Sequence, residues 1–287
     1  MTDTDAANPV PAEPRGRVLV VAGSDSGGGA GIQADIKTIT VLGGYAATAI
    51  TALTVQNTVE VKAVHPAPLG IVEGQIRAVL SDIGADAIKT GMLPDAEVIE
   101  AVAEAVEESA LPLILDPVMV AASGATLVPD EAMTAMRERL APLSYLITPN
   151  APEAHRLTGI EVEDVDGQRA AGEALLELGA KAALIKGGHL DSNEIIDVLV
   201  TRNGMRIFSR PRLRVRHTHG TGCTLASACA ALIAQGMSLD RAVEQAGDYL
   251  HEAIRRGPGF GEGHGPVDHG WPVRNAGVFG RSPVREE

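Results

Sequence analysis

The sequence contains few aromatic residues and only two cysteines, and each scarcity limits what the protein can be. Phe, Trp and Tyr make up 2% of the 287 residues, so the core must be built from Val, Ile, Leu and Ala. Cys223 and Cys229 are six positions apart in one expected helix. That spacing is neither a Cys-x-x-Cys motif nor a zinc pattern, and it disfavours a disulfide between them. The cysteine content therefore fits a reducing compartment.

Long apolar runs and an excess of basic residues are also missing. The longest apolar run, Leu225 to Ala234, is too short to span a bilayer. The stretch Val18 to Ala22 is too short for a secretory signal. The net charge of −13 argues against sequence-independent binding of nucleic acid. We therefore expect a cytoplasmic protein whose partners are small molecules, with no role for nucleic acid or a membrane.

Short strands and helices alternate along most of the chain. This alternation predicts an α/β fold with a doubly wound, mostly parallel sheet and helices on both faces. A hairpin at 195–200 and 205–208 should add a small antiparallel edge. We expect a disordered tail at 1–16, a single domain at 17–271 and a flexible tail at 272–287. The other expected strands are 18–22, 48–55, 87–90, 113–115, 145–148 and 183–185, and the expected helices are 32–42, 69–82, 95–109, 130–140, 166–179, 224–235 and 239–255.

The segment His219 to Cys223, HGTGC, is the most informative local motif. Its two glycines allow a tight turn before an Ala-rich helix, where unpaired N–H groups and the helix dipole favour an anion such as phosphate. The same position should lower the pKa of the Cys223 thiol and make it a usable base. The alternative is a helix start with a core cysteine and no binding role.

Several other polar residues follow expected strands, where open α/β sheets bind ligands. The loop Gly23 to Gly31 is rich in glycine but contains neither a Gly-x-Gly-x-x-Gly fingerprint nor a Walker A motif, so it is either a ligand-facing loop or a plain connector. Asp116 could hold Mg²⁺ through water. Lys186 could contact phosphate, because an unpaired buried lysine is costly. Asn150 and Glu153 could also form a simple helix cap.

Two further patterns have ordinary explanations that we favour. His189, His217 and His219 match no metal-ligand spacing and are expected to be ordinary polar residues. Arginines alternate from Arg210 to Arg216, which favours one charged face of an edge strand over a nucleotide-guiding surface.

Taken together, the motifs resemble the hydroxymethylpyrimidine/phosphomethylpyrimidine kinase family of thiamine biosynthesis, within the ribokinase-like superfamily. The resemblance covers about residues 17–270 in order. It rests on GSDSGGGAGIQADIK (23–37), TALTVQNT (51–58), KTGML (89–93), DPVM (116–119), TPNAPEA (148–154), KGGH (186–189) and HGTGC (219–223).

The resemblance implies a role for each motif residue. Asp35 and Gln56 would hold the aminopyrimidine edge in a pocket lined by Gly23, Met92 and Val118. ATP and Mg²⁺ would be bound by Thr148, Asn150, Glu153 and Asp116. Lys186 would balance charge on the transferred phosphoryl group, the turn Gly220–Thr221–Gly222 would form an anion hole, and Cys223 would replace the aspartate base of other ribokinase-like kinases.

The activity that follows is two successive ATP-dependent phosphorylations, of the hydroxymethyl group and then of the monophosphate, by a homodimer. Three alternatives stay open. They are a pyridoxal kinase of the same superfamily, a hydrolase with Cys223 as nucleophile, and a nucleotide sensor without catalysis.

Overall fold

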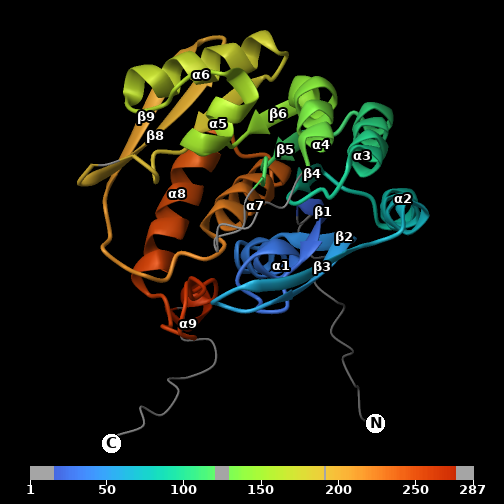
Figure 1. Ribbon diagram of the computed structural model, residues 1–287, viewed down its shortest axis with the longest axis horizontal. Coiled ribbons are helices and arrows are strands. Elements are labelled where there is room, and N and C mark those ends of the chain that lie inside the picture. The colour runs from blue at the N-terminus through green and yellow to red at the C-terminus, as the bar shows by residue number, and fades with distance from the viewer. Residues whose placement is uncertain (1–15, 120–128, 191, 276–287) are drawn as a thin grey trace, which may run out of the picture.

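A nine-stranded sheet runs through the computed structural model, which describes residues 16–119, 129–190 and 192–275 (Figure 1). The strand order is β3-β2-β1-β4-β5-β6-β7-β8-β9. The six strands from β2 to β7 in this order are parallel, while β3 pairs antiparallel with β2, and β8 and β9 continue antiparallel from β7. The strands are β1 (Arg17–Ser24), β2 (Tyr45–Gln56), β3 (Val61–Pro66), β4 (Ala87–Thr90), β5 (Leu113–Leu115), β6 (Ser144–Ile147), β7 (Ala182–Ile185), β8 (Glu194–Thr201) and β9 (Gly204–Pro211).

Helices cover both faces of this sheet. One apolar core lies under the helices α2, α3, α4, α5 and α6, and the other lies under α1, α7 and α8. Strand β1 supplies both cores from alternate side chains, with Leu19 and Val21 in the first and Val18 and Val20 in the second. The helices are α1 (Gly31–Val41), α2 (Leu69–Ala78), α3 (Ala96–Ser109), α4 (Asp130–Ala135), α5 (Ala151–Thr158), α6 (Val165–Glu177), α7 (Thr221–Ala234), α8 (Leu239–Arg255) and α9 (Trp271–Asn275), with the short turns η1 (Val79–Ile83), η2 (Met136–Leu140) and η3 (Ala141–Leu143).

Helix α7 is the element that joins the site to the core. It is almost entirely apolar, and nine consecutive residues from Thr224 to Leu232 are buried. A helix that is apolar all round belongs inside a domain, and α7 packs between α1, α8 and the strands β1, β4 and β5. Its N-terminus is thereby fixed at the carboxyl edge of the parallel strands, where open α/β sheets bind ligands.

The α/β fold, the mostly parallel sheet and the edge hairpin are confirmed. Strand β3 was not expected from the sequence, α5 was expected only as a possible helix cap at Asn150 and Glu153, and α9 includes residues 272–275 of the expected tail. The rest of both expected tails lies largely outside the described residues. None of the helices in the described part of the chain is long and apolar enough to cross a membrane.

Candidate active site

A cavity of about 690 Å³ opens at the carboxyl ends of the parallel strands. The site residues expected from the sequence line it, with the exceptions of Asp35 and Thr148. Motifs that are far apart in the chain therefore meet in one place. The expected residues in its wall are Gly23, Gln56, Met92, Asp116, Val118, Asn150, Glu153, Lys186, Gly220, Thr221, Gly222 and Cys223.

The turn that starts α7 forms one end of the cavity. Gly220 caps the helix in the left-handed region, with φ of 81°. A Cβ atom there would collide with the carbonyl oxygen of Gly29, so the turn and the glycine-rich loop can touch only because both residues are glycines. A Cβ on Gly222 would lie 3.3 Å from Nζ of Lys186. The first-turn N–H groups and a lysine therefore converge on the same space, which suits an anion.

Lys186 is the cation of a buried charge cluster. Its Nζ lies 3.4 Å from Oδ1 of Asp116 and 3.7 Å from Oε2 of Glu153. Burial alone would lower the pKa of Lys186, but the two carboxylates outweigh it and the pKa is raised. The lysine therefore stays protonated and can place a positive charge beside a phosphate.

Glu153 and Asn150 form a capping box at the start of α5, the alternative that the sequence left open. The backbone N–H of Asn150 donates to Oε2 of Glu153 at 2.7 Å, and the N–H of Glu153 donates to Oδ1 of Asn150 at 2.9 Å. Glu153 also faces Lys186, so capping and a place in the site are not exclusive. Burial, reinforced by Asp116, raises the pKa of Glu153 to about 7 against the pull of Lys186.

The donor set fits a magnesium ion carried by phosphates better than a metal site made of protein alone. No group of three or more His, Cys, Asp or Glu side chains that could hold a metal occurs among the described residues. Asp116, however, is buried and its Oδ2 atom has no hydrogen-bond partner. Mg²⁺ usually keeps several waters and takes one or two carboxylates plus substrate phosphates. Asp116 and Glu153 could supply those carboxylates.

The pKa of the Cys223 thiol differs from the one expected from the sequence. Its position in the first turn of α7 was expected to lower the pKa of the thiol. The thiol keeps some surface at the cavity wall, but burial raises its pKa to about 12 against the opposing effect of Lys89, with smaller upward contributions from Asp116 and Asp35. At neutral pH the thiol is therefore protonated, and the prediction of a lowered pKa is wrong.

Asp35 and Thr148 lie behind the cavity wall. Asp35 is fully buried, and its Oδ1 accepts from Nζ of Lys89 at 2.9 Å and from Oγ of Ser227 at 2.6 Å. Its Oδ2 has no partner. Burial raises the pKa of Asp35 despite the neighbouring Lys89. Thr148 is buried just beyond β6, with Oγ1 3.5 Å from the carbonyl oxygen of Leu115. Direct contact of either side chain with a ligand stays a prediction.

Apolar residues line another part of the cavity wall. Gly23, Met92 and Val118 line it, and Gln56 borders it from the end of β2. A Cβ on Gly23 would lie 2.6 Å from Cε of Met92, so Met92 packs directly against this glycine. Apolar side chains together with a single amide are typical of a site for a small heterocycle.

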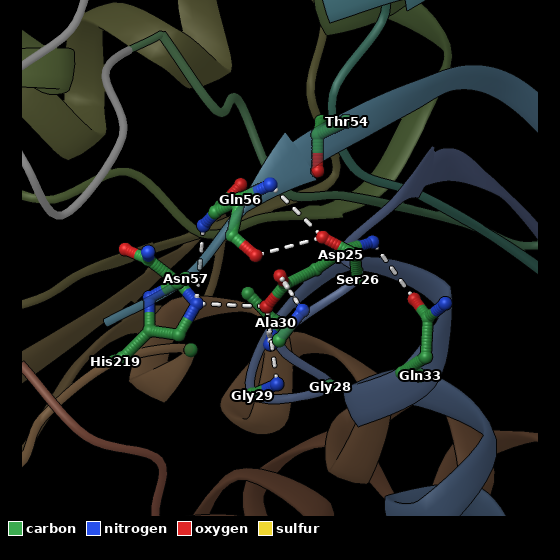
Figure 2. Close-up of polar contacts among 12 residues, drawn as sticks. Asp25, Ser26, Gly28, Gly29, Ala30, Gln33, Thr54, Gln56, Asn57 and His219 are labelled. Carbon is green, nitrogen blue, oxygen red and sulfur yellow. Dashed lines mark hydrogen bonds and ion pairs between the residues drawn. The ribbon is translucent and has the colours of Figure 1, made fainter. Parts of the chain in front are cut away.

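Asp25 and His219 were not recognised as site residues from the sequence. Both are buried, both line the cavity, and they contact each other through Oδ2 and Nε2 at 2.8 Å (Figure 2). The signal for Asp25 was present, because an Asp followed by glycines often accepts hydrogen bonds from the backbone of its own turn. His219 opens the HGTGC motif, but its contact with Asp25 spans 194 positions of sequence and could not be predicted.

The arginine series has a different role from the one expected. Strand β9 ends at Pro211, so a charged strand face reaching Arg216 is wrong. Arg212 instead donates to the carbonyl groups of Gly188, Leu190 and Ser192. It holds the loop that follows Lys186 in place.

The strand order and the site residues together identify the class of protein. A mostly parallel sheet, a glycine turn at a buried helix N-terminus, and a lysine with two carboxylates form the site of a ribokinase-like kinase for a small molecule. The family model described as phosphomethylpyrimidine kinase matches residues 25–268, and the chain belongs to this family.

Individual proteins agree with this assignment. The chain is 50% identical over 257 residues to the thiamine biosynthesis bifunctional protein ThiED of Geobacter sulfurreducens, covering 89% of this chain but only 52% of that longer protein. It is 46% identical to the hydroxymethylpyrimidine/phosphomethylpyrimidine kinase of Bacillus subtilis, covering 88% of this chain and 94% of that protein. Among solved structures, an ADP complex of Bacillus subtilis pyridoxal kinase is similar with a TM-score of 0.84 and 34% identity, covering 91% of this chain and 99% of the other.

Proposed function

We propose that the protein uses ATP to phosphorylate 4-amino-5-hydroxymethyl-2-methylpyrimidine to its monophosphate and then to its diphosphate, for thiamine biosynthesis. The observation that carries this proposal is the set of residues that a single cavity brings together. Gln56 with the apolar Met92 and Val118 suits a flat aminopyrimidine, and Lys186 with the α7 turn suits the phosphates. Relatives that are named for this activity cover the same length of chain.

Phosphoryl transfer demands positioning and charge neutralisation more than covalent chemistry from the protein. Lys186 is held protonated by Asp116 and Glu153 and would face the transferred group. The N–H groups from Gly220 to Gly222 would bind its oxygens. Bound Mg²⁺ would neutralise the ATP phosphates, held through Asp116 and Glu153. Asn150 and Thr148 would border the nucleotide, and Arg212 would fix the adjoining loop.

The second activity to consider is phosphorylation of pyridoxal. It is favoured by the similarity to a pyridoxal kinase along nearly the whole chain. The higher sequence identity to proteins named hydroxymethylpyrimidine/phosphomethylpyrimidine kinase, 45–46% against 34%, favours the pyrimidine as the principal substrate.

A direct assay tests the proposal. Purified protein with Mg²⁺-ATP is given the hydroxymethylpyrimidine, its monophosphate or pyridoxal, and ADP formation is followed together with the phosphorylated products. We expect turnover with both pyrimidines and a lower kcat/KM with pyridoxal. ATP turnover with neither pyrimidine would contradict the proposed function.

We also infer that the protein is a homodimer that associates through the β2–β3 extension. Three aliphatic residues of this extension have 54–58% of their surface exposed, namely Leu53, Val55 and Val59. Such exposure of apolar side chains is typical of an interaction surface. Light scattering should give twice the 29.7 kDa chain mass. Changing Leu53 and Val55 to lysine should shift the mass toward that of one chain. An unchanged mass in this double variant would contradict the assigned interface.

A further inference from the structure

The segment that follows α8 packs against the core and carries a buried histidine. Val267 and His269 of this segment are 3% and 5% exposed. The N–H of Asp268 donates to the carbonyl of Ala253 in α8 at 2.9 Å, and the hydroxyl of Tyr249 in α8 donates to the carbonyl of His269 at 2.9 Å. The backbone on both sides of the His269 side chain is therefore fixed on α8, which gives the ring a defined position.

The ring of His269 contacts α7 through Thr224. Its Nε2 lies 3.0 Å from Oγ1 of Thr224, and that hydroxyl lies 2.8 Å from the carbonyl oxygen of Gly220. Both side chains are buried behind the cavity wall and do not line it. Burial lowers the pKa of His269 to about 4, with smaller contributions from Lys37 and His219. The imidazole is therefore neutral at neutral pH and carries a single N–H.

The hydrogens of this chain of contacts can be assigned. A carbonyl oxygen only accepts, so the hydroxyl of Thr224 donates its one hydrogen to Gly220. Its oxygen then accepts from His269, which places the imidazole proton on Nε2. A threonine in a helix often bonds the carbonyl four residues earlier without help. His269 adds a second partner that directs the hydroxyl hydrogen toward Gly220, because a protonated Nε2 cannot accept it.

The carbonyl of Gly220 determines the direction of the first N–H group of α7. The peptide unit between Gly220 and Thr221 is planar, so this carbonyl and the N–H of Thr221 point in opposite directions. The carbonyl also accepts from the N–H of Thr224 at 2.9 Å. The N–H of Thr221 lies 3.4 Å from the carbonyl oxygen of Thr218, longer than an ordinary hydrogen bond, so it can still serve a ligand. The bonds that fix the carbonyl of Gly220 therefore fix an N–H group of the anion-binding turn.

We propose that His269 is a positioning residue for phosphoryl transfer, which acts through Thr224 to hold the peptide between Gly220 and Thr221 so that the turn presents its N–H groups to the transferred phosphoryl group. This inference rests on the proposed function, because the anion in question is that group. It gives the segment after α8 a role in the reaction without contact with either substrate.

Substitutions of His269 that lose or keep the N–H test this role. His269→Leu removes the donor and should lower kcat by about tenfold or more, the cost of a misplaced group at a reacting centre, with KM for the pyrimidine within about twofold. His269→Gln can place an NH2 group near the position of Nε2 and should recover most of the loss. His155→Leu is the matched control, since this half-exposed histidine of α5 does not line the cavity, and it should change neither constant.

The ratio of kcat with ATP to kcat with ATPγS adds a readout that a loss of folded protein does not change. Sulfur is a weaker hydrogen-bond acceptor than oxygen, so this ratio depends on how well N–H groups bind the γ-phosphoryl group. The natural chain should prefer ATP. His269→Leu should lower this preference by about threefold or more, the effect of one weakened hydrogen bond. His269→Gln should bring the preference back toward that of the natural chain.

A second substitution covers the case in which His269→Leu fails to fold. Thr224→Val removes the hydroxyl at nearly unchanged volume and should lower both kcat and the preference for ATP, whereas Thr224→Ser should recover both. The variant with both His269→Leu and Thr224→Val should be no slower than the slower single variant, because the two residues act in one chain.

Two results would overturn the inference. One is a natural kcat and a natural preference for ATP in folded His269→Leu or in Thr224→Val. The other is a fall in kcat with an unchanged preference for ATP, which would mean a general structural role. If the natural chain phosphorylates the pyrimidine, either result contradicts this inference alone. A natural chain that phosphorylates neither pyrimidine contradicts the proposed function as well.

Discussion

Replacing Glu153 by Gln should raise the stability of the protein at alkaline pH while it removes most of the activity. The pKa of Glu153 is about 7 in the folded protein, against an ordinary value of 4.5, because the carboxyl is buried beside Asp116. A folded-state pKa above the unfolded one means that folding favours the protonated acid. The stability contributed by Glu153 is therefore fully present below pH 4.5 and is lost as the pH rises through about 7.

The size of this effect follows from the shift. Each pKa unit corresponds to about 1.4 kcal/mol, so ionising Glu153 in the folded protein costs at most about 3.5 kcal/mol at a pH well above 7. Gln carries no charge and can still accept from the N–H of Asn150, so it keeps that half of the capping box. Glu153→Gln should gain most of this energy at about pH 8.5, a rise in Tm of roughly 5–10 °C. Near pH 5 the two proteins should differ by less than about 1 kcal/mol.

The stability is measured by thermal unfolding without nucleotide from about pH 5 to pH 9. Turnover is measured by a coupled assay of ADP release. We expect kcat to fall by at least about a hundredfold, the scale of losing a group that stabilises transferring charge. Glu108→Gln is a matched control on the exposed end of α3 and should change neither quantity. A Glu153→Gln protein that is less stable at every pH and keeps its turnover would show that Glu153 is a helix cap only.

Three further predictions concern residues of the cavity wall and the metal ion. Gln56→Ala should raise the dissociation constant of the pyrimidine about tenfold without affecting that of ATP, and equal constants in calorimetry would remove Gln56 from the site. Cys223→Ala should slow the two phosphorylations by a similar factor of less than about ten, since a thiol with a pKa of about 12 is a poor base at neutral pH; a hundredfold loss confined to the first step would contradict this. Chelation of Mg²⁺ with EDTA should abolish ADP release, and added Mg²⁺ should restore it in the natural chain but less readily in Asp116→Asn; turnover unaffected by EDTA would contradict a role for the metal.

Regular elements with a buried apolar pattern could be predicted from the sequence. The bounds expected for β4, β5 and α8 agree with the structure to the residue. Strand β3 could not be predicted in this way, because its side chains are largely exposed and show no alternation. It exists because it pairs with the long strand β2 through backbone hydrogen bonds.

Site features that a short motif determines locally could be predicted from the sequence. Features that depend on burial or on contacts between distant residues could not. The turn Gly220–Gly222 lies at a helix N-terminus as expected. The pKa of Cys223 depends on how deeply α7 is buried, and this depth is a property of the whole fold. The contact between Asp25 and His219 joins two loops that only the sheet order brings together.

The central claim is that one cavity performs two successive phosphorylations of an aminopyrimidine. The most direct measurement is a time course with the purified protein, excess Mg²⁺-ATP and the hydroxymethylpyrimidine, with alcohol, monophosphate and diphosphate separated by chromatography. The account predicts that the monophosphate rises first and is then converted to the diphosphate, with two ADP formed per pyrimidine. Accumulation of monophosphate that is never converted, or no consumption of the pyrimidine, would contradict it.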